Sequence, residues 1–376
     1  MSSRDILKNA RRVVVKIGTG ALTNATGRFN RDHFHALCAD LLWAATDREL
    51  VVVSSGAIAL GVERLEYAER PKDVPGKQAC AAVGQSRLMR AYEDAFDDGN
   101  RRVAQVLLTH DDVQDRRRYL NARHALNRLI AEEVIPIINE NDTVSIDELK
   151  FGDNDTLAGL VAGLLEADLL VILSDVEGLY SADPRTDPKA ELLSFIPTIS
   201  GEVMSLGTGS GTQVGTGGMA TKLRAAAHVT EVGIRCVITS GGTPGRLRQV
   251  LSGEEIGTLF ERKTSRRSAR QTWIAHALRP KGTVVVDAGA KAAVIDAKKS
   301  LLPSGIRLVE GTFGEGDPVD LLDESGVPFA RGLAAYPSEE MRLIAGKKSS
   351  EIEAILGYRY LDEAVHRDDL AVLAEG

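Results

Sequence analysis

The chain has 376 residues, of which 43% are hydrophobic and 26% are charged, and its formal net charge is −7. This length and composition predict a globular protein of two or three domains with a sizeable apolar core. The negative charge argues against a general nucleic-acid binder, because contacts to a phosphate backbone need clustered lysine and arginine side chains.

Six short runs of apolar, mostly β-branched residues alternate with longer helical patterns as far as about residue 260. The runs cover residues 12–18, 50–56, 103–109, 134–139, 168–175 and 234–241. Nearly continuous apolar runs of this kind are typical of parallel strands that are buried on both faces. The helical patterns between them include residues 31–46, 77–96 and 155–166. The alternation predicts an α/β/α sandwich built on a mostly parallel sheet.

The chain changes character after residue 260. Residues 261–281 contain seven Lys or Arg and one Glu, and we interpret 261–280 as a solvated basic linker, with a binding patch as the alternative. Beyond it, frequent Gly, Pro and Asp turns separate short apolar runs, which predicts a small β-barrel. We expect a helix near 290–299 and strands within 282–290, 306–313, 317–323, 327–336 and 340–346. The expected domains are therefore 1–260 and 281–376, joined by the linker 261–280.

The three cysteines, Cys38, Cys80 and Cys236, are far apart in the sequence. They match neither a metal-ligand spacing nor a disulfide framework, which favours a reducing, cytoplasmic environment. The first twelve residues carry charges where a signal peptide would need an apolar stretch. The longest apolar region, 157–173, contains two acidic residues, so it predicts a buried helix and strand and not a membrane span.

Glycine or polar residues follow five of the predicted strands. In a parallel α/β sheet, ligands bind beyond the carboxyl ends of the strands. The residues at these ends are 16–20, 54–57, 139–142, 174–175 and 240–242. Because all five segments are expected on the same edge of the sheet, they predict a binding site there.

Lys16 ends the first predicted strand and is followed by Gly18 and Gly20. Burying its ammonium group without an anionic partner would cost free energy, so Lys16 either meets an anion or reaches solvent beyond the strand. The two glycines favour close approach of a ligand to the backbone. At residues 54–61 a strand runs directly into a helix, whose first N–H groups suit either an anion or ordinary capping by Ser55.

Carboxylate and amide side chains are concentrated in two clusters, one over residues 138–145 and one at Asp153, Asn154 and Asp155. One such residue before a helix is ordinary N-capping, but three in succession exceed what capping needs. A metal site is an alternative, although adjacent side chains point in different directions and would not form a full cage. The seven histidines form no convergent motif, and we assign none of them to catalysis.

The segment VGTGGMATKLRAA, residues 214–226, is a glycine-rich turn that contains Lys222 and runs into a helical pattern. It is not a P-loop, because no Gly-Lys-Ser/Thr sequence follows four residues after a glycine. A phosphate-binding loop and a flexible surface loop are both open on this pattern alone. Ser174 and Asp175 end another buried strand, where a carboxylate can orient a lysine or a magnesium-bound phosphate.

Together, six motifs resemble those of the glutamate 5-kinases, a group within the amino-acid kinase family. They are VVVKIGTGAL, VVVSSGAIALG, IINENDTVS, FGDNDTLAGLVA, LSDVEGLYSADPR and GTGGMATKLRAA, and their order and spacing match over nearly all of residues 1–260. Ser174 is a small departure, since Thr is frequent before this Asp, but both supply a hydroxyl group. The segments LLPSGI, VEGTFGEGDPVDLLDESG, FARGLAAY and AVHRDDL resemble the PUA domain that many members carry at the C-terminus.

The resemblance implies phosphorylation of the γ-carboxylate of L-glutamate by ATP to L-glutamyl 5-phosphate, the first step of proline synthesis from glutamate. It also implies Mg²⁺ and feedback inhibition by proline. We further expect a homo-oligomer with no membrane partner.

The same resemblance assigns roles to residues of this sequence. Lys16 would contact the phosphates of ATP, Lys222 would stabilise the transferring phosphoryl group, and Asp155 would hold the two lysines in place. Three residues are expected to bind glutamate: Ser55, Asp142 and Asn154. The expected nucleotide site comprises Lys16, Ser174, Asp175, Thr216, Gly217, Gly218, Met219, Ala220, Thr221 and Lys222. Magnesium is expected on the phosphates and not in a protein metal site.

Two alternatives remain open. Another member of the family, such as an acetylglutamate, aspartate or UMP kinase, would share the lysines and glycine loops but lack the NEND and FGDND motifs found here. RNA binding is the alternative for the C-terminal domain. Residues 281–376 contain 11 Lys or Arg against 17 Asp or Glu, which is the wrong sign for a surface that follows phosphates, so a nucleic-acid partner is not expected.

Overall fold

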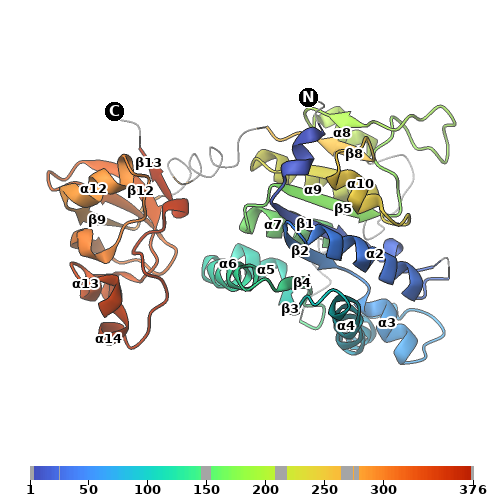
Figure 1. The fold of residues 1–376 in the computed structure, drawn as a ribbon, viewed down its shortest axis with the longest axis horizontal. Helices are drawn as coiled ribbons and strands as arrows, with labels where there is room; N and C mark the ends of the chain where they lie inside the picture. The colour runs from blue at the N-terminus through green and yellow to red at the C-terminus, as the bar shows by residue number, and fades with distance from the viewer. Residues whose placement is uncertain are drawn as a thin grey trace. The chain divides into compact units, whose positions relative to one another are not determined.

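The computed structural model describes residues 4–24, 26–144, 154–207, 218–263, 274 and 279–373. The chain divides into two compact units, Met1–Ser265 and Arg266–Gly376 (Figure 1). The division falls within the segment 261–280 that the sequence marks as a linker. Each unit has its own sheet and its own apolar core.

An eight-stranded sheet, in the order β3-β4-β2-β1-β5-β7-β8-β6, forms the centre of the first unit. Its strands are β1 (Arg12–Ile17), β2 (Glu49–Ser54), β3 (Val103–Leu108), β4 (Ile135–Glu140), β5 (Leu169–Ser174), β6 (Phe195–Ile196), β7 (Arg235–Ser240) and β8 (Thr258–Phe260). Neighbouring strands are parallel except for β7 and β8. All six predicted strands are confirmed. The sequence did not reveal β6 and β8, which are too short to show an apolar run.

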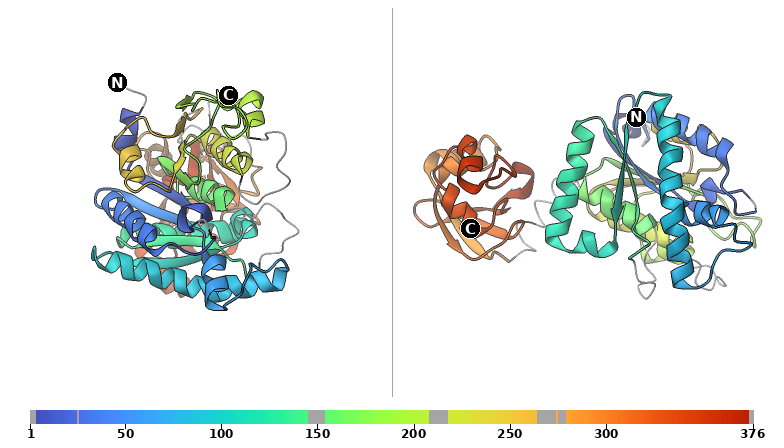
Figure 2. Two further views of the ribbon diagram at one scale, coloured as in Figure 1. Left: turned by 90° about the vertical axis from the view of Figure 1, so that its right-hand side faces the viewer. Right: turned by 90° about the horizontal axis from the view of Figure 1, so that it is seen from below.

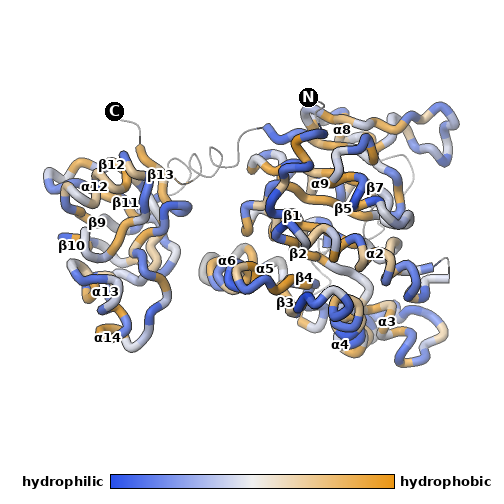
Figure 3. Tube along the Cα trace, in the orientation of Figure 1, coloured by the Kyte–Doolittle hydropathy of each residue, from blue (hydrophilic) through white to orange (hydrophobic). Residues whose placement is uncertain are grey.

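Helices cover both faces of this sheet, which confirms the α/β/α sandwich. They are α1 (Thr19–Leu22), α2 (Arg31–Ala44), α3 (Ala57–Arg64), α4 (Val74–Asp97), α5 (His110–Gln114), α6 (Arg116–Ala131), α7 (Asn154–Leu164), α8 (Gly201–Leu206), α9 (Met219–Glu231) and α10 (Arg246–Leu251), with a short 3₁₀ helix at Asp5–Asn9. In the right-hand view of Figure 2, α4 and α6 flank the strands from opposite sides. The strands between the helices are largely apolar (Figure 3).

Successive residues of β1 enter different cores, because side chains of a strand alternate between the faces of a sheet. Val13, Val15 and Ile17 pack in a core with α2 and α4, whereas Val14 packs in the other core with α7 and α9. Lys16 belongs to the same face as Val14. The alternation therefore directs the lysine toward α7 and α9.

Helices α3 and α4 cross unusually closely through Gly61 and Gly84. A Cβ atom added to Gly61 would lie 1.8 Å from the carbonyl oxygen of Cys80, and one added to Gly84 would lie 1.7 Å from that of Ala57. Any larger residue would force the two helices apart. Because α3 begins at Ala57, two residues after Ser55, this contact fixes the position of the segment that follows β2.

A five-stranded sheet, in the order β10-β9-β11-β12-β13, forms the second unit. Its strands are β9 (Gly282–Val286), β10 (Ile306–Gly311), β11 (Pro318–Leu322), β12 (Pro328–Leu333) and β13 (Leu370–Val372). Strands β9 and β11 are parallel and the other neighbours are antiparallel. The helices among the described residues of this unit are α12 (Ala288–Ile295), α13 (Ser338–Ile344) and α14 (Ile352–Leu356), along with 3₁₀ turns at Pro303–Gly305, Ser349–Glu351 and Arg367–Asp369.

The strand expected at 340–346 is wrong, because the structure has helix α13 there. Met341 and Ile344 are fully buried, while Leu343 between them is 59% exposed. Positions three apart share one face of a helix, whereas alternation in a strand would bury residues two apart. The short apolar run was therefore assigned the wrong period. The helix expected near 290–299 exists but lies a few residues earlier, as α12.

Candidate active site

Three charged side chains from distant parts of the sequence meet in the interior of the first unit. The Nζ atom of Lys16 lies 2.5 Å from Oδ1 of Asp155, and the Nζ atom of Lys222 lies 3.2 Å from Oδ2 of the same carboxylate. Asp155 is fully buried and each lysine is only 4% exposed. Charges this deeply buried require partners. Two ammonium groups around one carboxylate form an arrangement that suits an anionic ligand.

Each member of this lysine–aspartate cluster is placed by its own secondary structure. Lys16 is directed from β1 toward α7 and α9. Asp155 lies in the first turn of α7, where the helix dipole favours a negative charge. Lys222 lies in the first turn of α9, and the hydroxyl of Thr221 donates a hydrogen bond of 2.9 Å to Oδ2 of Asp155.

The turn after β1 runs close to the ends of β5 and β7. A Cβ atom on Gly18 would lie 3.3 Å from the carbonyl oxygen of Leu173 and 3.5 Å from Nζ of Lys16, and one on Gly20 would lie 3.2 Å from Cβ of Asp175. The backbone N–H of Gly18 donates to the carbonyl of Leu173 over 2.9 Å. The predicted nucleotide-site residues at the end of β5 therefore adjoin the cluster.

Ser174 and Asp175 differ in exposure. Ser174 is 2% exposed, and its hydroxyl donates a hydrogen bond of 2.8 Å to Oδ1 of Asp175. Asp175 itself is exposed. The carboxylate thus stands at the surface of the sheet edge, outside the lysine–aspartate cluster.

A second group of side chains consists of amides and hydroxyls. Nδ2 of Asn154 donates to Oγ of Ser55 over 2.9 Å and to Oδ1 of Asn139 over 3.0 Å. Nδ2 of Asn139 donates to Oε1 of Gln85 over 2.9 Å. Asn154 directly precedes Asp155, so this amide cluster adjoins the lysine–aspartate cluster. The structure thus brings together Ser55 and Asn154, two of the three residues expected to bind glutamate.

The remaining predicted residues have different outcomes. Asp142 follows β4 by two residues and is half-buried. Gly218 immediately precedes α9, and Met219 and Ala220 belong to its first turn. Thr216 and Gly217 lie outside the described residues, as does Asp153.

Sequence reasoning gave no role to Gln85, although it belongs to the amide cluster. It lies in the middle of the 24-residue helix α4 and is 9% exposed. Nothing in the sequence around a mid-helix glutamine signals a contact with a strand 54 positions later. Asn139 was noted only as part of the polar end of β4, and the structure shows that it joins Gln85 to Asn154.

The thiol of Cys236 lies in β7 and is completely buried. Burial raises its pKa, and the negative charge of Asp155 raises it further. Cys38, in α2, is also fully buried, and desolvation raises its pKa. Neither thiol is therefore suited to act as a nucleophile.

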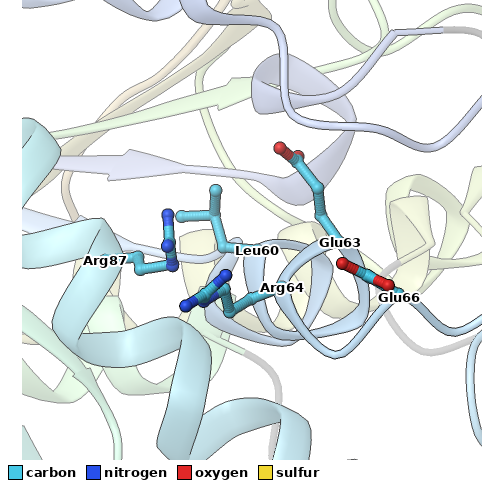
Figure 4. A pocket seen from close by; sticks show the side chains of 5 residues that line it. All are labelled: Leu60, Glu63, Arg64, Glu66 and Arg87. Carbon is cyan, nitrogen blue, oxygen red and sulfur yellow. The ribbon is translucent and has the colours of Figure 1, made fainter.

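A separate pocket of about 160 Å³ lies on α3 and α4, lined by Leu60, Glu63, Arg64, Glu66 and Arg87 (Figure 4). Its four charged side chains are all exposed to solvent. None of them takes part in the lysine–aspartate or amide contacts given above. The buried clusters, and not this pocket, contain the groups suited to chemistry.

Within the ranges that the structure describes, no helix is long and apolar enough to cross a bilayer. Over the same ranges, no three His, Cys, Asp or Glu side chains are grouped so that they could hold a metal ion.

Comparison with known families gives two matches. The amino acid kinase family matches residues 11–240, and the PUA domain matches residues 282–356. The first match covers the β1–β7 region that carries both clusters, and the second covers most of the second unit.

Curated relatives match along their full length. The chain is 68% identical over 372 residues to glutamate 5-kinase of Myxococcus xanthus, covering 99% of each chain. It is 49% identical to glutamate 5-kinase of Anaeromyxobacter dehalogenans over 100% of this chain and 99% of that protein. Among solved structures, carbamate kinase from Giardia lamblia bound to AMP-PNP is 19% identical, with a TM-score of 0.49, over 68% of this chain and 100% of that chain.

Proposed function

This chain belongs to the glutamate 5-kinases of the amino acid kinase family and carries a C-terminal PUA domain, and we propose the chemistry of its site as follows. The γ-carboxylate of L-glutamate attacks the terminal phosphorus of ATP, giving L-glutamyl 5-phosphate and ADP. This reaction begins proline biosynthesis from glutamate. The observation that carries the proposal is the buried cluster in which Lys16 and Lys222 share Asp155.

The reaction requires positive charge and positioning more than proton transfer. The γ-carboxylate of glutamate has an unperturbed pKa of about 4.3, so it is ionised at neutral pH and needs no general base. The obstacle is repulsion between this anion and the phosphates of ATP. Lysines held in fixed positions reduce that repulsion and stabilise charge in the transition state. A site with two buried lysines and no assigned histidine fits this requirement.

The two lysines have different proposed roles. Lys16, on the central strand, contacts the phosphates of ATP in the ground state. Lys222, at the start of α9, follows the phosphoryl group as it transfers. Asp155 keeps both ammonium groups apart and oriented before ATP binds, because each lysine contacts a different oxygen of its carboxylate.

We place Mg²⁺ on the phosphates of ATP. Among the described residues, no group of three acidic, histidine or cysteine side chains could hold the ion by itself, and Asp155 is already engaged by two lysines. Of the expected nucleotide-site residues, Asp175 has an exposed carboxylate. This carboxylate can accept a hydrogen bond from a water molecule that is bound to the ion. When bound, the ion offsets part of the negative charge of the phosphates.

We propose that the amide cluster binds glutamate. Ser55 and Asn154 provide a hydroxyl and an amide next to Asp155, and Asp142 follows the neighbouring strand β4. A charged amino acid bound here would lie beside the two lysines. We also propose that proline inhibits by competing for this site, since it shares the α-carboxylate and amine of glutamate. If proline lowered the maximal rate at saturating glutamate and left the apparent KM for glutamate unchanged, simple competition would be contradicted.

The proposed substrate is tested by comparing ADP release with glutamate, N-acetylglutamate, aspartate and UMP as acceptors. We expect release with glutamate to exceed release with each of the others. An equal rate with any of them would contradict the assignment. The comparison separates glutamate phosphorylation from the activities of related kinases that share the same fold.

For the second unit, we propose a structural or regulatory role in place of RNA binding. Residues 281–376 carry more acidic than basic side chains, which disfavours contact with a phosphate backbone. We also propose that the enzyme works in the reducing cytoplasm, where its three free cysteines would remain reduced, and that it forms a homo-oligomer. Micromolar, salt-sensitive tRNA binding by the full chain would contradict the proposal for the second unit.

A further inference from the structure

Gln85 and Asn139 are two buried amide side chains that extend the amide cluster into the core. Gln85, in α4, is 9% exposed, and Asn139, in β4, is 2% exposed. Buried amides are normally hydrogen-bonded, and here Oε1 of Gln85 accepts from Asn139 while Nε2 of Gln85 has no hydrogen-bond partner among the described residues. The direction in which each amide points therefore decides which atoms remain for a ligand.

The orientation of Asn139 is fixed by the backbone. The N–H group of Glu140 donates to Oδ1 of Asn139 over 2.9 Å. Since an N–H group can only donate, the atom that it meets must be the amide oxygen. The nitrogen of Asn139 then points the other way, to Oε1 of Gln85. Gln85 thus supplies a hydrogen-bond acceptor for the buried nitrogen of Asn139.

The orientation of Asn154 follows from that of Asn139 and from a second backbone group. Its Nδ2 atom faces Oδ1 of Asn139 at 3.0 Å, and it also lies 3.3 Å from the carbonyl oxygen of Ser54. Both of these atoms can only accept, so the nitrogen of Asn154 must face them. The two hydrogens of this nitrogen are shared among Asn139, Ser54 and Ser55. Of the polar side-chain atoms of Asn154, this leaves Oδ1, which has no hydrogen-bond partner among the described residues.

These orientations define what the cluster can offer to a substrate. The hydroxyl oxygen of Ser55 accepts from Asn154, so its own hydrogen is left to donate, and a carboxylate is a suitable acceptor. Oδ1 of Asn154 can only accept, and an ammonium group is a suitable donor. One donor and one acceptor side by side complement the carboxylate and ammonium groups of an α-amino acid.

We propose that Gln85 is a positioning residue for the amino-acid subsite and acts through Asn139. By accepting the hydrogen bond of Asn139, it adds a side-chain contact to the orientation that the N–H group of Glu140 sets, and so keeps Oδ1 of Asn139 on the nitrogen of Asn154. The inference rests on the proposed function, because it takes glutamate as the ligand of Ser55 and Asn154. Gln85 itself is not a catalytic residue.

The test uses two substitutions of Gln85 in the full-length chain. Gln85→Met keeps the length and approximate volume of the side chain but removes the acceptor. Gln85→Glu keeps an acceptor oxygen for Asn139 whether or not the carboxyl group is ionised. The matched control is Gln249→Met, because Gln249 is a half-buried residue of α10 and the substitution makes the same exchange in another helix. Steady-state ADP release gives KM for glutamate, KM for ATP and kcat.

We expect Gln85→Met to raise the KM for glutamate about 10-fold, on the scale of one lost hydrogen bond. The KM for ATP and kcat should change much less, and Gln85→Glu and Gln249→Met should stay close to the wild type. An unchanged KM for glutamate in Gln85→Met, or an equal rise in both KM values, would overturn the proposal. If Gln85→Met does not fold, a large rise in the glutamate KM of Gln85→Glu overturns it.

A double-mutant cycle separates positioning from a general loss of packing. If Gln85 acts through Asn139 on Asn154, adding Gln85→Met to Asn154→Ala should raise the KM for glutamate little further. Effects that multiply would show that Gln85 acts independently and would overturn the inference while leaving the proposed function intact. A wild-type enzyme that releases no ADP with glutamate would instead overturn the proposed function, and this inference with it.

Discussion

Lys16 and Lys222, 206 positions apart in the sequence, hold the two oxygens of a single buried carboxylate. The Nζ–Oδ distances to Asp155 are 2.5 Å and 3.2 Å. Two like charges in the interior would repel each other strongly without the shared aspartate. The arrangement keeps both ammonium groups ready for phosphates, and the following predictions derive from it and from the adjoining amide cluster.

Lys222→Ala should lower kcat by roughly 100-fold or more, because one preorganised electrostatic group is lost from the transition state. The KM for glutamate should change little. Steady-state kinetics on the purified variant measures both constants. Lys347→Ala, an exposed lysine of the second unit, is the control and should behave as the wild type. A near wild-type kcat for Lys222→Ala would show that Lys222 does not act on the transferring phosphoryl group.

Asn154→Ala should raise the KM for glutamate far more than it lowers kcat. The side chain is proposed to hold the substrate equally in the ground state and the transition state, and such uniform binding affects KM. The measurement is a glutamate titration at saturating ATP. A drop in kcat with an unchanged KM would place Asn154 among the groups that act only in the transition state.

Asp155→Asn should destabilise the free enzyme and lower kcat. Removing the carboxylate charge takes away the counter-charge that the two buried lysines share, at a cost of about 3–5 kcal/mol. Urea unfolding should show a lower midpoint, and ATP with magnesium should restore part of the stability because its phosphates supply negative charge. Asp296→Asn, an exposed site, is the control. An unchanged midpoint for Asp155→Asn would show that the lysines are not held by this charge.

The cysteines should resist thiol reagents while the protein is folded. All three are buried, and burial raises the pKa of the Cys38 and Cys236 thiols. Because deprotonation is disfavoured only in the folded state, labelling at pH 8 should begin when denaturant unfolds the first unit. Counting labelled thiols by mass spectrometry gives the result. Rapid modification of Cys236 under native conditions would contradict its burial beside Asp155.

Removing the residues after about position 275 should leave a folded kinase. Every proposed site residue lies before position 223, and the first compact unit ends at Ser265. Circular dichroism and ADP release on the shortened chain test this, while inhibition by proline is free to change. A soluble, folded fragment without activity would show that the second unit is needed for catalysis.

The sequence predicts the parts of the fold that depend on local pattern. Six strands stand out because each is a nearly continuous apolar run, and Lys16 stands out because it interrupts the first one. The two-residue strand β6 and the three-residue strand β8 leave no such signal. The run at 340–346 was assigned to a strand because seven residues are too few to distinguish a period of two from one of 3.6.

For the site, the sequence supplied most of the residues and, through the family resemblance, one of their connections. The pairing of Lys16 and Lys222 with Asp155 was expected from the family resemblance, and the contact itself follows from the packing of α7 and α9 on one face of β1. Gln85 could not be found in this way, because its role depends on the orientation of one amide, which a backbone N–H group of β4 decides. Hydrogen-bond direction is a property of the folded chain and has no sequence signature.

The most direct test of the account is to trap the acyl phosphate. Glutamate, ATP, magnesium and hydroxylamine are incubated with the wild-type enzyme and with Lys222→Ala, and γ-glutamyl hydroxamate is measured. We predict ATP-dependent hydroxamate with the wild type and roughly 100-fold less with Lys222→Ala. ADP release without any hydroxamate from the wild type would contradict phosphoryl transfer to the glutamate carboxylate.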